Sequence, residues 1–224
     1  MNSQLSTIEI QPESVHQYSV IWLHGLGADG HDFEGVVGEL HLHAAANIHF
    51  IFPNAPLQPV TVNSGMKMRS WYDILDMTLE SAVDIEGIYQ STGLIEQLIE
   101  KEQAAGIRSE NILLAGISQG GVISLHTGLR YPHKLAGIVA LSTYLPTVEQ
   151  LKTESSAANK STPVFMGHGI LDSVVPIELA KSAFDTLDAM GYPIKWHDYL
   201  MKHSLCAEEI HHISAFMNTA FIQA

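Results

Sequence analysis

The chain has few of the features that mark secreted or membrane-spanning proteins. Its single cysteine, Cys206, excludes an internal disulfide and is typical of a reducing compartment. No apolar run approaches the ~20 residues that a membrane-spanning helix needs. Residues 1–17 lack the basic start and the apolar stretch of a secretory signal. These absences predict a cytoplasmic protein with no stable membrane insertion.

Basic residues are also scarce. The sequence has 11 Lys and Arg against 24 Asp and Glu, a formal net charge of −13, and no basic cluster. Such a surface repels nucleic acid and anionic lipid headgroups. We therefore expect no nucleic-acid partner.

Hydrophobic residues, at 46%, are ample for one core, and short apolar runs alternate with segments of helical spacing. This order predicts an α/β fold with a mostly parallel central sheet and helices on both faces. No break in composition marks a boundary, so residues 1–224 are expected to form a single domain. The strands are expected at residues 5–10, 18–23, 48–52, 112–115, 135–141, 163–166 and 194–199. The helices are expected at residues 32–42, 83–105, 119–131, within 146–161, at 177–190 and at 207–222.

One turn in this pattern indicates nucleophilic chemistry. The apolar run 112–115 leads directly into Gly116-Ile-Ser118-Gln-Gly120, and a helical pattern follows. This is G-x-S-x-G in a strand–turn–helix context, where the tight turn exposes the serine hydroxyl and only small residues fit two positions before and after it. We interpret Ser118 as a nucleophile rather than as an incidental serine in a glycine-rich turn.

A serine needs a base to take its proton and an acid to orient that base. In such a sheet, all three should follow strands at the carboxyl edge. His203 follows the last predicted strand, and Asp172 follows the strand at 163–166. The order Ser118, Asp172, His203 is the nucleophile–acid–base order of an α/β-hydrolase. His168 competes as the base but precedes Asp172, and Asp198 competes as the acid but lies inside a strand close to His203.

Two backbone N–H groups are candidates for an oxyanion hole. Gln119 directly follows the nucleophile, and Leu26 lies between Gly25 and Gly27 in the glycine-rich loop after the strand at 18–23. That loop has a rival interpretation as a phosphate cradle. It lacks the lysine of G-x-x-x-x-G-K-[ST] and the full G-x-G-x-x-G spacing, which disfavours this reading.

The other histidines give no specific metal signal. His41-x-His43 and the pair His211-His212 lack both the i,i+4 spacing and an accompanying cysteine or carboxylate. We therefore expect no metal.

Residues 53–82 form a long apolar segment without a sustained period. Its large side chains either fill the core or line an acyl groove beside Ser118, open or closed. The candidate substrate-binding residues are Leu57, Met66, Trp71 and Leu75. Asp73 is not assigned to the catalytic set.

Six segments together resemble the phospholipase/carboxylesterase family, which includes bacterial carboxylesterases and acyl-protein thioesterases. These segments are residues 24–27, 68–73, 116–120, 141–145, 168–172 and 203–209. The resemblance spans nearly the whole chain. It implies an α/β-hydrolase without a separate cap domain, and a serine hydrolase acting on carboxylic esters or thioesters of apolar acyl chains.

The same resemblance implies the triad Ser118, Asp172 and His203 and an oxyanion hole at Leu26 and Gln119. It also implies no metal and no cofactor, with a small-molecule ester or an acylated protein or lipid as substrate. Members of that family often pair, which raises the expectation of a homodimer. A lysophospholipase-type hydrolase, a non-catalytic binding module on the same fold and a nucleotide-binding α/β protein are the alternatives.

Overall fold

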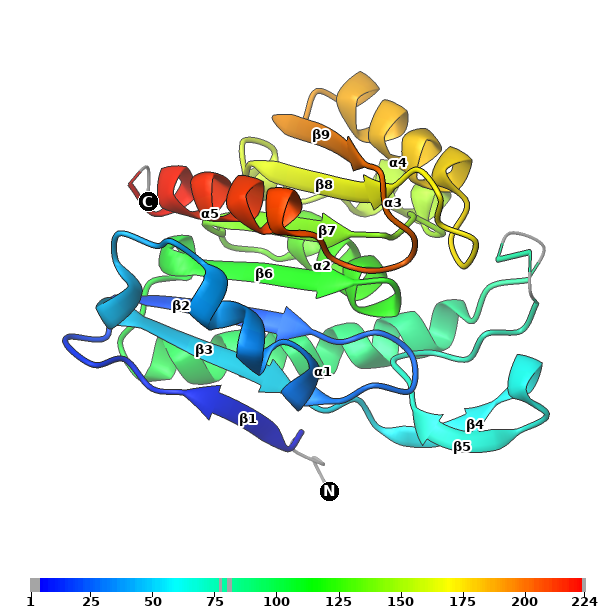
Figure 1. The fold of residues 1–224 in the computed structure, drawn as a ribbon, viewed down its shortest axis with the longest axis horizontal. Helices are drawn as coiled ribbons and strands as arrows, with labels where there is room; N and C mark the ends of the chain where they lie inside the picture. The colour runs from blue at the N-terminus through cyan, green and yellow to red at the C-terminus, as the bar shows by residue number, and fades with distance from the viewer. Residues whose placement is uncertain (1–4, 77, 80–81, 223–224) are drawn as a thin grey trace.

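A seven-stranded sheet runs through the middle of the molecule (Figure 1). The computed structural model describes residues 5–76, 78–79 and 82–222. The strand order is β1-β3-β2-β6-β7-β8-β9. β1 is antiparallel to β3, and the other neighbours are parallel. The strands are β1 (Thr7–Ile10), β2 (Tyr18–Leu23), β3 (Ile48–Pro53), β6 (Ile112–Ile117), β7 (Gly137–Leu141), β8 (Val164–Gly169) and β9 (Ile194–Tyr199).

Helices cover both faces of this sheet, as the sequence predicts. They are α1 (Ile85–Ala104), α2 (Gln119–Arg130), α3 (Val148–Glu154), α4 (Ile177–Ala189) and α5 (Ala207–Ile222). α5 packs on one face, and α1, α2 and α4 pack on the other (Figure 1). None of the helices in the described part of the chain is long and apolar enough to cross a membrane.

The sequence of β2 shows why two cores form. Successive side chains of a strand point to opposite faces. Val20 and Trp22 therefore join the core beneath α5, while Ile21 and Leu23 join the core beneath α1 and α2. All four are fully buried. A strand covered on both faces needs such a continuous apolar run.

Residues 32–42 differ from the prediction of one helix. They form two 3-10 segments, Gly30–Asp32 and Glu34–Glu39. Two glycines, Gly35 and Gly38, lie within the second segment, and glycine weakens a helix interior by ~1 kcal/mol relative to alanine. The apolar face that suggested a helix is still used, since Phe33 and Leu40 are buried in the core.

Residues 53–82 contain a hairpin that the sequence did not reveal. β4 (Leu57–Val60) pairs with β5 (Met66–Arg69) in a separate antiparallel sheet. Each strand has only four residues, Pro59 lies within β4 and half of the residues of the pair are exposed, so neither strand was recognised from the sequence. The hairpin extends from the edge of the molecule toward which the parallel strands point (Figure 1).

One buried carboxyl group belongs to the first turn of α5. Glu209 is fully buried, and neither of its carboxyl oxygens has a hydrogen-bond partner among the described residues. Burial raises the pKa of Glu209 to about 8. The side chain is therefore a neutral acid at neutral pH.

Replacing Glu209 with glutamine should change how stability depends on pH. In the unfolded chain the carboxyl has a pKa near 4.5, against about 8 in the fold. Below pH 4.5 the carboxyl holds its proton in both the folded and the unfolded chain. Its ionisation then makes no contribution to the free energy of unfolding. As the pH rises from 4.5 to 8, unfolding releases the proton, so the free energy of unfolding falls by about 1.4 kcal/mol per pH unit. The free energy of unfolding of Glu209→Gln should not show this fall with pH. Urea denaturation at pH 5, 6.5 and 8 measures the difference.

The matched control is Glu208→Gln, because Glu208 is the neighbouring residue and is exposed. We expect its unfolding curves to keep the pH dependence of the wild type. Equal pH slopes for Glu209→Gln and the wild type would show that Glu209 is ionised in the fold.

Candidate active site

Ser118 occupies a strained turn between β6 and α2. Its φ of 54° and ψ of −122° lie where L-residues are rarely found. A Cβ added to Gly116 would collide with the backbone of Gly120, and one added to Gly120 would collide with the carbonyl of Leu23. The turn is fixed by neighbours, since Ser118 N–H donates to the Leu141 carbonyl at 2.9 Å. Local sequence thus places a serine hydroxyl at the carboxyl edge.

Asp172 and His203 are joined by a short hydrogen bond. His203 Nδ1 lies 2.7 Å from Asp172 Oδ2, and the Asp172 side chain is fully buried. Asp172 Oδ1 accepts the backbone N–H groups of Val174 at 2.8 Å and Val175 at 2.9 Å. Three donors therefore hold the carboxylate. Because an ionised carboxylate only accepts, the His203 proton lies on Nδ1 and Nε2 is left with its lone pair.

Ser118 and His203 line the same cavity, which has a volume of about 450 Å³. His203 follows β9 and Ser118 follows β6, so the parallel order of the strands brings both to one edge of the sheet. The side chain of His203 is 21% exposed, which leaves its ring accessible from the cavity. A base with a free nitrogen and a hydroxyl thus face a shared space.

The glycine-rich loop after β2 lies against Ser118. A Cβ added to Gly25 would be 3.5 Å from the Cβ of Ser118. The N–H groups of Gly27 and Ala28 donate to the carbonyls of Arg69 and Gly25. Leu26 lies between Gly25 and Gly27 and borders the cavity. Its backbone N–H therefore stays the predicted donor of an oxyanion hole.

His24, which the sequence left without a role, holds this loop in place. Its Nε2 accepts the Ala55 N–H at 3.0 Å, and its Nδ1 lies 2.6 Å from the Gly25 carbonyl. Accepting on one nitrogen and donating on the other requires the neutral ring. Burial lowers the pKa of His24 and favours that form. No sequence motif separates such a structural histidine from a catalytic one.

Gln119 is anchored through its side chain. Its Oε1 accepts the Trp71 N–H at 3.1 Å, and its Nε2 donates to the Tyr72 carbonyl at 2.7 Å. Trp71 in turn donates through Nε1 to the His24 carbonyl at 2.9 Å. These bonds tie the start of α2 to the segment after β5, so both candidate oxyanion loops are fixed before substrate arrives.

A second cavity, of about 170 Å³, also opens onto Ser118 and is mainly apolar. The side chains that form its apolar wall are Val62, Tyr72, Ile74, Leu79, Tyr144, Val174 and Val175. The sequence pointed to the right segment for four of these, but Tyr144 follows β7 and the two valines follow β8.

The four candidate substrate-binding residues lie elsewhere. Leu57 and Met66 are on the hairpin and are 67% and 65% exposed, and Leu75 is 40% exposed. Trp71 is buried beneath the loop. None of them lines either cavity beside Ser118. They were chosen as large apolar residues of this segment, and hydrophobicity does not show which way a side chain points where no periodic pattern is recognised.

The two competing residues occupy other positions. His168 is buried, with its Nε2 2.9 Å from the Val175 carbonyl and 3.4 Å from Asp172 Oδ2. It thus supports the Asp172 loop from below. Asp198 is exposed and accepts a hydrogen bond from Trp196 Nε1 at 3.1 Å. Neither lines the cavity that Ser118 and His203 share.

Comparison with known proteins gives one consistent result. A model of the phospholipase/carboxylesterase family matches residues 6–221. Acyl-protein thioesterase 1 of Yarrowia lipolytica is 38% identical over 208 residues, which cover 91% of this chain and 92% of that protein. The Neurospora crassa protein of the same name is 40% identical over 213 residues, covering 90% of this chain and 86% of that protein. The crystal structure of Zea mays acyl-protein thioesterase 2 aligns with a TM-score of 0.86 and 26% identity, covering 96% of this chain and 99% of that chain.

The fold is therefore that of an α/β-hydrolase, with no separate cap domain in the part of the chain that the structure describes. The chain belongs to the phospholipase/carboxylesterase family, and it is a carboxylic ester hydrolase. The predicted fold, family and class of enzyme are confirmed.

Proposed function

We propose that this protein hydrolyses carboxylic thioesters and esters of apolar acyl chains through an acyl-serine intermediate, in the manner of an acyl-protein thioesterase. The observation that carries the proposal is the 2.7 Å bond between Asp172 and His203 at the cavity of Ser118. The names of the curated relatives support the substrate class. We also propose that residues 1–224 form a single hydrolase domain that acts in the cytoplasm.

In the proposed mechanism, His203 Nε2 takes the proton of Ser118 as its oxygen attacks the acyl carbonyl. Asp172 stays ionised, keeps the proton of the neutral ring on Nδ1 and stabilises the imidazolium that forms. The carbonyl bond to the thiol or alcohol then breaks, and His203 returns a proton to the leaving group where one is needed. In the second half, His203 takes a proton from water as the water oxygen attacks the acyl carbon. The bond from that carbon to Ser118 Oγ then breaks, His203 returns the proton to Oγ, and the carboxylic acid leaves.

Charge on the tetrahedral intermediate needs fixed donors. We assign them to the backbone N–H groups of Leu26 and Gln119. The bonds of His24 and of the Gln119 side chain support this role, because they fix both loops in advance. Preorganised donors of this kind are typically worth roughly 2.7–4 kcal/mol each in the transition state.

The apolar cavity of about 170 Å³ is the proposed site for the acyl chain. Each buried methylene is worth at most ~0.8 kcal/mol, or about fourfold in kcat/KM. We expect kcat/KM to rise from acetyl to medium chains and to level off once the chain outgrows the cavity. Matched thioesters and p-nitrophenyl esters of increasing length measure this dependence. A preference for acetyl substrates would contradict the acyl role of the cavity.

Filling this cavity should remove the preference for longer chains. Val62 lines it, so Val62→Phe is expected to lower kcat/KM for an octanoyl substrate about tenfold or more while sparing the acetyl substrate. Leu57→Phe adds a ring to an exposed hairpin position and serves as the control. The assignment fails if both variants keep the chain-length profile of the wild type.

A panel of substrates distinguishes this function from the alternative functions. Turnover of an acylated peptide thioester supports the proposal. Turnover of lysophospholipids without thioesters would favour the lysophospholipase alternative. Binding of either class without turnover would favour a non-catalytic module. The panel also decides whether the natural substrate class is an acylated protein or a small ester, while gel filtration tests the expected homodimer.

A further inference from the structure

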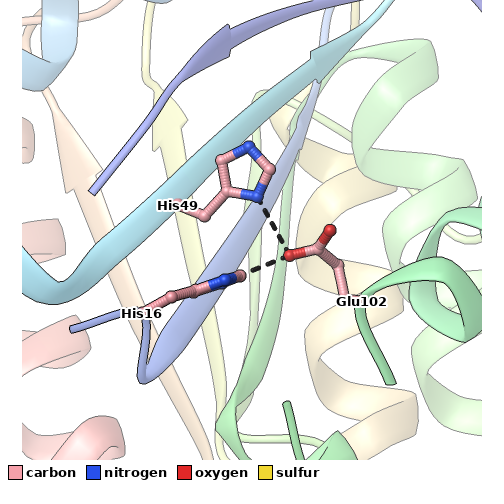
Figure 2. A group of neighbouring side chains, drawn as sticks. All are labelled: His16, His49 and Glu102. Atoms are coloured by element: carbon pink, nitrogen blue, oxygen red, sulfur yellow. Dashed lines mark hydrogen bonds and ion pairs between the residues drawn. The ribbon is translucent and has the colours of Figure 1, made fainter. Parts of the chain in front are cut away.

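A second group of chemically reactive side chains lies far from Ser118. Figure 2 shows His16, His49 and Glu102 pointing toward one another. His16 precedes β2, His49 is the second residue of β3, and Glu102 lies in the last turn of α1. They meet at the amino ends of the parallel strands, whereas Ser118 lies at the carboxyl ends. The proposed chemistry of the active site does not use them.

The group is buried but has an opening. His49 is 5% exposed and Glu102 is 2% exposed, whereas the side chain of His16 is 25% exposed. A carboxylate and two imidazoles are rarely placed together in such surroundings unless they are paired or bind an ion. His16 leaves one side accessible to solvent, which provides an entry path and a position for a water ligand.

Three potential ligand atoms converge at this point. His49 Nδ1 lies 3.0 Å and His16 Nε2 lies 3.4 Å from Glu102 Oε2. All three atoms lie within 4.8 Å of one another. Zinc holds nitrogen and oxygen at ~2.0–2.2 Å, which makes the edges of its tetrahedron about 3.4 Å long. Small side-chain rotations therefore suffice to place an ion between them.

The surroundings of His49 match those of a metal ligand. Its other nitrogen, Nε2, lies 3.2 Å from Glu9 Oε2 and 3.1 Å from Gln11 Nε2. Histidines that bind metals through one nitrogen generally donate the other N–H to a carboxylate or carbonyl. With an ion bound, the proton of His49 would lie on Nε2, which donates to Glu9, and Nδ1 would give its lone pair to the ion.

Ser19 completes the ring of polar groups. Its hydroxyl donates to Glu102 Oε2 at 2.6 Å and lies 3.0 Å from His16 Nε2. Ser19 and His49 are register partners on β2 and β3, so the sheet fixes their spacing. The hydroxyl orients the carboxylate beside the two imidazoles.

We propose that His16, His49 and Glu102 bind one divalent transition-metal ion of the Zn²⁺ class. Two imidazoles and one carboxylate are a ligand set that zinc uses, with a fourth position left for water. The ion also balances charge, because the carboxylates of Glu9 and Glu102 flank the site. It joins β2, β3 and α1, so its expected effect is on stability rather than on turnover at the distant Ser118.

Protons compete with the metal for the same atoms. Burial opposes the charge on His49, but the hydrogen bonds and charges of Glu102 and Glu9 outweigh it and raise the pKa of His49. Burial lowers the pKa of His16 despite Glu102. The other charged group facing the site is Lys101, whose Nζ lies 3.6 Å from Glu9 Oε1. Because an imidazole binds a metal ion only in its neutral form, metal affinity should be higher at pH 8 than at pH 6.

The test uses the full chain, treated with a chelator and then freed of it. Zn²⁺ is titrated by calorimetry, and Co²⁺ is titrated while its visible absorption reports the geometry of coordination. We expect one equivalent to bind, with the intense absorption of a four-coordinate Co²⁺ ion, and Zn²⁺ to raise the melting temperature. His16→Ala and Glu102→Gln should each weaken Zn²⁺ binding by about tenfold or more.

Controls separate this site from ordinary histidine binding. His211→Ala removes an exposed histidine from the His211-His212 pair and should leave the affinity and the stoichiometry of one unchanged. Esterase activity and circular dichroism establish that each variant is folded. The proposal is overturned if the wild type binds no stoichiometric metal, or if His16→Ala and Glu102→Gln bind it as tightly as the wild type. Loss of binding in His211→Ala would likewise overturn it.

Discussion

Ser118→Ala is expected to lower kcat/KM for thioesters and esters by about 10⁵- to 10⁶-fold. The variant keeps both cavities and both of the proposed backbone donors but has no oxygen to form the acyl intermediate. Its KM should change little, since the hydroxyl is not part of the apolar wall of the smaller cavity. Steady-state kinetics with a p-nitrophenyl ester and a thioester measure the effect.

Ser14→Ala is the matched control, because Ser14 is exposed and lies outside both cavities. It should retain the activity of the wild type. Thermal unfolding should show Ser118→Ala folded, since alanine also occupies the small space in the turn. A Ser118→Ala enzyme with wild-type kcat/KM would remove the nucleophile from the proposed mechanism.

Asp172→Asn should lower kcat by about 10³- to 10⁴-fold with little change in KM. An asparagine oxygen in the place of Oδ1 still accepts the N–H groups of Val174 and Val175. Its amide nitrogen then faces His203 Nδ1 and donates to it. This forces the ring proton onto Nε2, the nitrogen that must accept the proton of Ser118.

Asp198→Asn makes the same chemical change at an exposed aspartate, which accepts a hydrogen bond from Trp196. It should keep full activity. The comparison distinguishes an orienting acid from a general loss of negative charge, because both variants lose one charge. Wild-type turnover in Asp172→Asn, or a comparable loss in Asp198→Asn, would contradict the assignment of the acid.

The sequence predicted the features that depend on the order of neighbouring residues along the chain. β2 and β6 are continuous apolar runs, and G-x-S-x-G requires a tight turn, so the strand–serine–helix unit around Ser118 could be inferred directly. The parallel sheet then placed the loops with Asp172 and His203 at the same edge. For that reason His203 Nδ1 lies 2.7 Å from Asp172 Oδ2, although the two residues are separated by 31 positions in the sequence.

What the sequence did not predict depends on packing between distant segments. The strands of the hairpin β4–β5 have only four residues each, and Pro59 lies within β4, so neither strand was recognised. The wall of the smaller cavity combines Val62 and Ile74 with Tyr144, which follows a different strand. The cluster of His16, His49 and Glu102 comes from three elements, so no ligand spacing marks it.

The most direct test of the central claim is covalent labelling with a fluorophosphonate, followed by mass spectrometry of the peptides. Such probes react with a serine that an adjacent base activates. The account predicts one adduct per chain, on the peptide that contains Ser118, and strongly reduced labelling in His203→Ala. An active enzyme that is labelled on another residue, or is not labelled, would contradict it.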